Sequence, residues 1–232
     1  MTRLRVATYN VHKCKGVDWR VSPARIAEVI CELDADLLAA QEVLYSQAHL
    51  IADELRVPFF FGRARQHAGE PYGNAIFTRH SVQSSEEYDL TVPGREPRQC
   101  LRVSVTVTES RPVHLFAVHL GTSLLERREQ ARRFSSDILE PTENWGSRVV
   151  AGDFNEWTRG LATQTLSRYL RSADISLHLK RTRTYPGLLP FMHLDHIYYD
   201  PDFYLREMHL HRTRLSLLAS DHLPLIADFE TH

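Results

Sequence analysis

Short apolar runs alternate along this chain with stretches in which apolar residues recur every three or four positions. The runs have the length of buried β-strands and lie at residues 4–9, 36–40, 59–61, 74–77, 101–107, 113–119, 148–151, 194–199 and 223–229. Ser22 and Pro23 suit the N-cap and the first position of a helix. An apolar face follows at helical spacing, formed by Ile26, Val29, Ile30 and Leu33. Further helices are predicted over residues 46–55, 123–139 and 162–170.

The order of these elements predicts an α/β protein, but not one with a regular alternation of strand and helix. Several strands follow one another between residues 75 and 119 without a helix between them, which favours antiparallel pairing. Two mixed sheets packed face to face, with helices outside, accommodate this order. The chain has no internal repeat and no linker rich in Gly, Ser or Pro, so we predict a single domain over residues 1–232.

The composition is that of an ordinary globular protein, with 43% hydrophobic and 25% charged residues. Lysine and arginine number 28 against 29 acidic residues, which disfavours binding of nucleic acid through bulk positive charge. A nuclease is still compatible with this balance, because an enzyme needs only a local groove. The three cysteines form no C-x-x-C pair. The start of the chain does not resemble a signal peptide, and no apolar run reaches about 18 residues, so we predict a cytoplasmic protein.

Polar side chains stand repeatedly at the ends of the predicted strands. A single such residue is most often a cap or a turn residue, but so many are difficult to explain one by one. The sharpest case is Gly-Asp-Phe-Asn at residues 152–155, where an extended chain would project Asp153 and Asn155 to the same side. These two side chains suit a water or a phosphoryl oxygen beside a cation. An Asx-turn that closes the strand is the alternative.

The segment Ser-Asp-His-Leu-Pro-Leu at residues 220–225 is the second signal. Asp221 offers an oxygen that suits a hard divalent ion, and His222 is a candidate base near neutral pH. A histidine in that role needs a carboxylate on its other ring nitrogen, and Asp195 is the candidate. Two capping residues before an edge strand are the alternative interpretation.

In chain order the sequence contains Thr-Tyr-Asn, Gln-Glu, Tyr-Gly-Asn-Ala-Ile, Val-His-Leu, Gly-Asp-Phe-Asn, Leu-Asp-His-Ile-Tyr and Ser-Asp-His-Leu-Pro. This series spans nearly the whole chain and resembles the endonuclease/exonuclease/phosphatase superfamily. The resemblance implies a four-layer α/β sandwich, in which two central mixed β-sheets are flanked by helices. It also implies metal-dependent hydrolysis of a phosphoester, here expected to be a phosphodiester that an activated water attacks in line.

Carried onto this chain, the resemblance implies a divalent ion, Mg²⁺ or alternatively Mn²⁺. Glu42 would be its principal ligand, helped by Asn10 and Asp221. Asp153 and Asn155 would bind and polarise the attacking water and the scissile phosphate.

The histidines complete the site that the resemblance implies. His222, paired with Asp195, would act on the water or hold a phosphate oxygen. His119 would bind phosphate or protonate the leaving group, and Asn74 lies in a segment that the family often has near the substrate. Members of the family differ in whether the aspartate or the histidine is the base, and both assignments stay open here.

The substrate stays open between nucleic acid, phospholipid and a small phosphodiester. Residues suited to nucleic acid are Arg63, Arg65, Arg181, Arg183 and Tyr185. Residues 187–192, Gly-Leu-Leu-Pro-Phe-Met, carry four apolar side chains and no charge. If exposed, this loop would suit an acyl chain and peripheral contact with a membrane; if buried, it only closes the end of the sandwich. No stable protein partner is predicted.

Two other classes are alternatives to a phosphodiesterase. One is an interaction module on the same fold without catalysis. Such a module is expected to have lost a carboxylate or a histidine of the site, and none is missing. The other is a zinc-binding protein that uses His193, Asp195 and His196. Alternation along a strand would bring His193 and Asp195 together and turn His196 away.

Overall fold

The computed structural model describes residues 2–107, 111–142, 145–156, 160–173, 184–186 and 192–231. Two mixed sheets pack face to face. The first comprises, in spatial order, β11 (Tyr204–Leu210), β12 (Leu225–Thr231), β1 (Thr2–Asn10), β2 (Leu37–Leu44), β4 (Glu70–Thr78) and β3 (Phe59–His67). The second comprises β5 (Ser81–Asp89), β6 (Gln99–Thr106), β7 (Pro112–His119), β8 (Ser147–Asp153), β10 (Asp195–Tyr199) and β9 (Arg171–Ser172).

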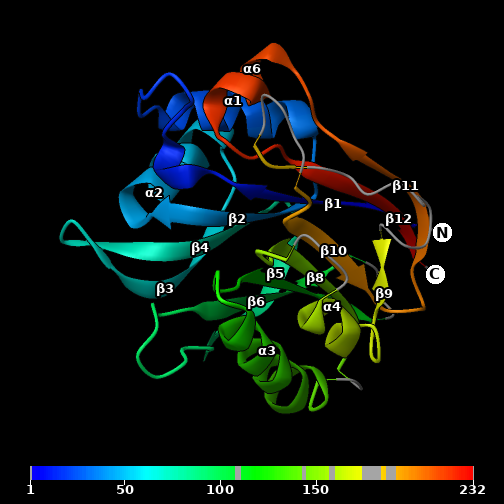
Figure 1. Cartoon of the computed structure of the whole chain (residues 1–232). Helices are drawn as coiled ribbons and strands as arrows, with labels where there is room; N and C mark the ends of the chain where they lie inside the picture. The colour runs from blue at the N-terminus through cyan, green and yellow to red at the C-terminus, as the bar shows by residue number, and fades with distance from the viewer. Residues whose placement is uncertain are drawn as a thin grey trace.

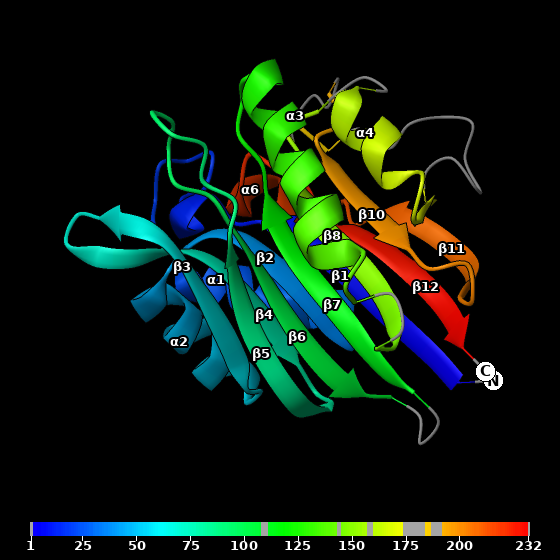
Figure 2. The same ribbon diagram turned by 90° about the horizontal axis from the view of Figure 1, so that it is seen from below.

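Helices cover the outer face of each sheet, as Figure 1 shows. Those beside the first sheet are α1 (Pro23–Leu33), α2 (Tyr45–Leu55) and α6 (Arg214–Ala219), and a short 3-10 turn η1 (His12–Cys14) follows β1. Those beside the second sheet are α3 (Leu124–Arg133), its π-helical continuation η2 (Phe134–Leu139) and α4 (Leu161–Leu166). Figure 2 shows α3 and α4 lying across the second sheet. The predicted four-layer α/β sandwich is therefore confirmed.

Alternation along the strands produces the layers. In β1, Val6 points into the core between the two sheets, whereas Ala7 packs against the helices outside the first sheet. In β8, Val149 faces the core between the sheets and Val150 faces α3 and its continuation. A strand covered on both faces reads as a continuous apolar run, which is why these strands could be recognised in the sequence.

Most predicted elements are present, and several others were missed. Helix α1 begins as expected, with the Ser22 hydroxyl accepting from the backbone N–H of Arg25 and with Pro23 in the first turn. The helix expected over residues 123–139 forms, with a π-helical second part, while α4 ends earlier than expected. The strands β5, β9 and β11 and the helix α6 were not predicted. In β5 most side chains are exposed, so the strand lacks the apolar run that marked the others.

Strand pairing brings the ends of several strands to one place. Strands β1 and β2 pair in parallel, so Asn10 lies beside Gln41. Strands β7 and β8 also pair in parallel, so His119 lies beside Asp153, and Asp153 is in turn the partner of Asp195 on antiparallel β10. Within the part of the chain that the structure describes, no helix is long and apolar enough to cross a membrane.

Candidate active site

Glu42 reaches the site because the end of β2 is distorted. The pairing of β2 with β4 shifts register between Ala40 and Val43, which is a β-bulge. Glu42 itself has a φ of 58°, in the left-handed region that costs a non-glycine residue energy. Bulges and strained residues of this kind are frequent beside functional sites, where they redirect a side chain.

Asn10 joins the two sheets at the centre of the site. Its Nδ2 donates to Asp153 Oδ2 at 3.0 Å and to Glu42 Oε1 at 3.3 Å. Glu42 Oε2 also accepts from Lys13 Nζ at 3.2 Å. Burial opposes the charge of Glu42, but His119, Lys13 and Asn10 outweigh it and lower the pKa of Glu42 well below its usual range. Glu42 is therefore an ionised carboxylate beside its neighbour Asp153.

His222 and Asp195 form the predicted pair. His222 Nδ1 lies 2.8 Å from Asp195 Oδ2, and both side chains are buried. His222 Nε2 therefore faces the other way, 3.8 Å from Asp153 Oδ2. Burial lowers the pKa of His222, but the charges of Asp195, Asp153 and Asp221 outweigh burial and raise it to about 10. Asp195 thus fixes both the orientation and the positive charge of this ring.

His119 approaches the same point from the end of β7. Its Nε2 lies 3.9 Å from Glu42 Oε1 and 3.9 Å from Asp153 Oδ2, too far for hydrogen bonds. Burial and the nearby Arg98 lower the pKa of His119 to about 3. Burial and the charge of Asp195 raise the pKa of Asp153 to about 7, against the opposing effect of His222.

Asp153 and Asn155 both line the site, but not by the extended geometry that the sequence suggested. Strand β8 ends at Asp153, and Asn155 has a φ of 49°. The backbone N–H of Asn155 donates to Asp153 Oδ1 at 2.8 Å, which is the Asx-turn considered as the alternative. Gly152 permits close packing here, since a Cβ would lie 1.9 Å from the carbonyl oxygen of Val118. The turn and the site therefore coexist.

Asp221 is part of the cavity lining, whereas Asn74 is not. Asp221 lines the site, with Oδ1 3.2 Å from His12 Nδ1. Asn74 is buried between the sheets, where its Nδ2 donates to the backbone carbonyls of Gln99 and Ala117 at 3.3 and 3.2 Å. That position favours a structural role for Asn74, and its predicted contact with substrate stays untested.

A cavity of about 500 Å³ opens over these groups. It is lined by His12, Lys13, Glu42, Arg65, Tyr72, Glu96, Arg98, His119, Thr122, Asp153, Asn155, Tyr185, Met192, Leu194, Asp221 and His222. Sequence reasoning missed Lys13, Tyr72 and Arg98. A usable signal existed for Lys13, because it is one of only three lysines in the chain and follows Asn10 by three residues.

The donor atoms suit a hard divalent ion. Glu42 and Asp221 contribute carboxylate oxygens to one cavity, and Asn10 has an amide oxygen beside them that accepts from the backbone N–H of His12. Mg²⁺ and Mn²⁺ prefer such oxygen ligands. Asp153, Asp195 and His222 also have ligand atoms within 4.8 Å of one another. His222 is already committed to Asp195 there, so we regard Glu42 as the better centre for an ion.

The residues of the zinc alternative do not converge as that hypothesis requires. Asp195 faces His222, while the His193 and His196 rings contact each other with centroids 4.1 Å apart. His196 Nε2 lies 2.9 Å from the carbonyl oxygen of Glu156.

Only part of the predicted substrate-binding residues can be located. Arg65 and Tyr185 line the cavity and Arg63 is exposed, whereas Arg181 and Arg183 lie outside the described residues. Residues 187–191 of the apolar loop also lie outside them, so its predicted exposure stays untested. Met192, the last residue of that loop, is half-buried and lines the cavity.

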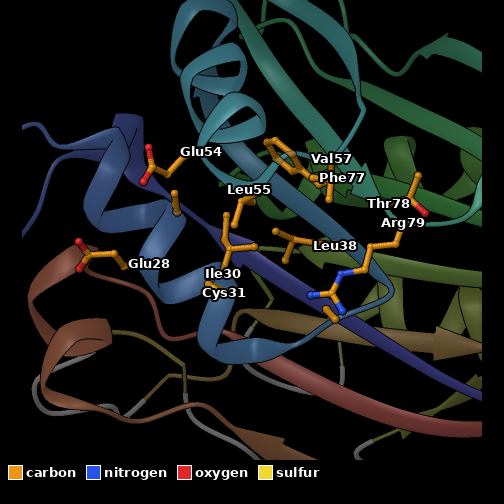
Figure 3. Close-up of a pocket in the computed structure, with 12 residues that line it drawn as sticks. Glu28, Ile30, Cys31, Leu38, Glu54, Leu55, Val57, Phe77, Thr78 and Arg79 are labelled. Carbon is orange, nitrogen blue, oxygen red and sulfur yellow. The ribbon is translucent and has the colours of Figure 1, made fainter.

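A second cavity, of about 250 Å³, lies between α1, α2 and the strands beneath them (Figure 3). Its lining is mainly apolar, with Ile30, Leu38 and Phe77 among its residues, and Glu28, Glu54 and Arg79 beside them. None of the predicted site residues is part of it. The predicted site residues that line a cavity therefore lie around the larger one, at the strand ends.

Comparison with known proteins agrees with this geometry. The Endonuclease/Exonuclease/phosphatase family matches residues 7–222. The uncharacterised protein YbhP of Escherichia coli K12 is 28% identical over 215 residues, covering 84% of this chain and 83% of YbhP. Among solved structures, the mannosyl-6-phosphatase Bt3783 of Bacteroides thetaiotaomicron superposes with a TM-score of 0.81 at 18% identity, covering 98% of this chain and 99% of Bt3783. TDP2 of D. rerio, in complex with a single-stranded DNA product, gives 0.76 at 16% identity and covers both chains fully.

Proposed function

We propose that this chain, which belongs to the endonuclease/exonuclease/phosphatase family, is a divalent-metal-dependent phosphodiesterase that uses an activated water. One observation carries the proposal. Asn10 and Glu42 from one sheet meet His119 and Asp153 from the other, and His222 faces Asp153 with its Nε2 atom. This arrangement offers acceptors for a water proton and donors for phosphate oxygens within one cavity.

A phosphodiester repels a nucleophile by its own negative charge, so the site must offset that charge as a fifth oxygen joins phosphorus. Glu42, Asp221 and Asn10 would hold Mg²⁺ or Mn²⁺, which supplies Lewis-acid charge when bound. Asp153 and Asn155 orient the attacking water: both line the cavity, the Asx-turn holds the Asp153 carboxylate, and Asn155 Nδ2 donates to the carbonyl oxygen of Leu120, which leaves its amide oxygen for the water.

The histidines have separate tasks in this proposal. His222 points Nε2 at Asp153 because Asp195 occupies Nδ1. Since its ring is positively charged, His222 donates to Asp153 or to a phosphate oxygen, and the water proton passes to Asp153. His119 lies 3.9 Å from Asp153, and with its pKa lowered to about 3 it is a neutral ring that contacts a phosphate oxygen or the leaving-group oxygen through a hydrogen bond. The pKa of about 7 supports Asp153 as the base, with His222 as the positively charged donor beside it.

The substrate is proposed to be a nucleic acid or a phospholipid, and a different observation favours each. Arg65 stacks on the Tyr72 ring with its Cζ 4.4 Å from the centroid, a surface that suits a nucleotide. Trp19 is 78% exposed beside a smaller cleft of about 280 Å³ that shares His12 and Asp221 with the main cavity. An exposed tryptophan there suits an acyl chain or a membrane interface.

A panel of phosphoesters tests the function. We would offer plasmid DNA, single-stranded and abasic DNA, phospholipid vesicles, inositol phosphates and bis(4-nitrophenyl) phosphate, each with Mg²⁺ or Mn²⁺ and each with excess chelator. We expect ion-dependent hydrolysis of at least one diester. Full activity in chelator would contradict the metal-dependent mechanism. Failure to hydrolyse every substrate of the panel would contradict the proposal that the protein is a phosphodiesterase.

A further inference from the structure

Two arginines in the cavity wall have no task in the proposed reaction. Arg65 lies in β3, and Arg98 lies just before β6. Both bind one carboxylate, that of Glu96: Arg65 Nη2 lies 2.8 Å from Oε1, and Arg98 Nη2 lies 2.9 Å from Oε2. Two positive charges therefore face one negative charge at this part of the wall.

The arginine pair is buried more completely than its partner. The Arg98 side chain is only 7% exposed, whereas that of Glu96 is 46% exposed. Among the described residues, the Nε atoms of Arg65 and Arg98 are buried without a hydrogen-bond partner. Leaving a buried, charged donor unpaired is costly, so these two arginines keep hydrogen-bonding capacity that a water or a ligand in the cavity would satisfy.

The pair also lies next to the reaction centre. Arg65 stacks on Tyr72, and Tyr72 is buried beside Glu42, whose charge together with burial raises the tyrosine pKa far above its usual range. Arg98 is close enough to His119 to lower the pKa of that histidine, after burial. Arg65, Tyr72 and Arg98 line the same cavity as Glu42 and His119.

We infer that Arg65 and Arg98 bind a second phosphate group of the substrate, beside the scissile phosphoester, and that the Glu96 carboxylate occupies this position in its absence. Guanidinium groups bind phosphate through paired N–H donors, in the same geometry in which they bind a carboxylate. The inference rests on the proposed function, because it assumes that a phosphoester occupies the cavity. The second phosphate would come from a neighbouring nucleotide or from a phosphorylated lipid headgroup.

Calorimetric binding in the presence of chelator tests this site without turnover. We would compare thymidine 3′,5′-bisphosphate with thymidine 5′-phosphate, and inositol 1,4-bisphosphate with inositol 1-phosphate. We expect the wild-type protein to prefer the bisphosphate of one pair by about tenfold or more in Kd. The pair that shows the preference distinguishes a nucleotide source from a headgroup source.

Variants then assign the preference to the arginines. Arg65→Gln and the charge-retaining Arg98→Lys should each reduce it to about threefold or less, because each removes part of the paired donors. Glu96→Gln should increase it, because the competing charge is lost. Arg206→Gln is the matched control: Arg206 also stacks on a tyrosine, Tyr204, and pairs with a glutamate, but on β11 outside the cavity.

The outcomes separate this inference from the proposed function. No preference in either wild-type pair, or a preference that survives both arginine variants, would overturn the second-phosphate site. If Glu96→Gln abolishes the preference for the bisphosphate, Glu96 does not compete with the phosphate. The Glu96 carboxylate would then instead hold the two arginines in place for the ligand, and its proposed role as a stand-in for phosphate would be wrong. If the protein prefers the bisphosphate but hydrolyses no phosphoester, the proposed phosphodiesterase activity is wrong and the second-phosphate site stands.

Discussion

Asp195→Asn removes the negative charge that faces His222 while it keeps the shape of the side chain. The perturbation is well defined because the Nδ1–Oδ2 distance is 2.8 Å and both side chains are buried. At this distance a unit charge pair is worth about 6 kcal/mol in an effective dielectric constant of about 20. Desolvation offsets part of this, and a remainder of about 3 kcal/mol corresponds to about a hundredfold in rate. We therefore expect kcat to fall by about 10²-fold.

A double-mutant cycle with His222→Ala identifies the cause. If Asp195 acts only through His222, Asp195→Asn should change kcat by less than about threefold in the His222→Ala background. The assay is steady-state hydrolysis of the best diester from the panel, with circular dichroism to verify folding. In the metal-free protein, the pKa of His222 should also fall from about 10 toward its ordinary value, measured by NMR titration of the imidazole.

Asp228→Asn is the matched control for this cycle. Asp228 is likewise a buried carboxylate paired with a positively charged side chain, that of Arg5, but it lies outside the cavity. It should lower stability without a comparable loss of kcat. Near-normal turnover in folded Asp195→Asn, or an equal loss in both backgrounds of the cycle, would refute the positioning role of Asp195.

Three further changes test the site and the fold. Glu42→Gln should raise the Mg²⁺ concentration needed for half-maximal activity by about tenfold or more, because an amide lacks the charge that attracts the ion; an unchanged metal titration would contradict the ligand role. Asp153→Asn and His222→Ala should each lower kcat by about 10²–10⁴-fold in folded protein, and retained turnover would contradict the assignment. Asp228→Asn should lower the free energy of unfolding at pH 7 by about 1–3 kcal/mol, measured by urea denaturation. Burial raises the pKa of Asp228, but hydrogen bonds from Arg5 and Arg3 outweigh burial and lower this pKa in the folded protein. The contribution of Asp228 to the free energy of unfolding is therefore complete above the pKa of the unfolded state and disappears as the pH falls through the pKa of the folded state. The wild-type and variant curves should therefore approach each other as the pH falls below about 4 and meet below the folded-state pKa, and a gap that persists below that pKa would contradict the ionic origin.

The sequence was informative where a residue's neighbours along the chain determine its environment. Strands such as β1 and β8 are covered on both faces, so their apolar runs were visible, and the polar residues that end them stood out. Strand β5 was missed because its exposed side chains make it resemble a loop until β6 pairs with it. The residues of the site show the same limit, because local sequence does not reveal which segments pair in the folded protein.

Residues that enter the site through tertiary structure could not be found in this way. Glu42 was identified, but the bulge that directs it into the cavity depends on pairing with β4. Tyr72 and Arg98 reach the cavity only because β4 and the segment before β6 meet across the two sheets. Asn74 is a different case: it lies two residues after Tyr72 on β4, is not part of the cavity lining and donates to backbone carbonyls of the second sheet, so its contact with substrate stays a prediction.

The two kinds of element that build the cavity have different mechanical properties. His119, Asp153 and Asp195 are held at paired positions of three adjacent strands, so backbone hydrogen bonds fix their mutual distances. Catalytic groups need such precision, since small displacements cost rate. Lys13, Glu96 and Tyr185 come instead from segments outside the strands, which can change in length or sequence without altering that register. Under the proposed function we therefore expect the strand ends to set the phosphoester chemistry, and the surrounding segments, with Glu96 among them, to tune, together with Arg65 of β3, which phosphoester enters.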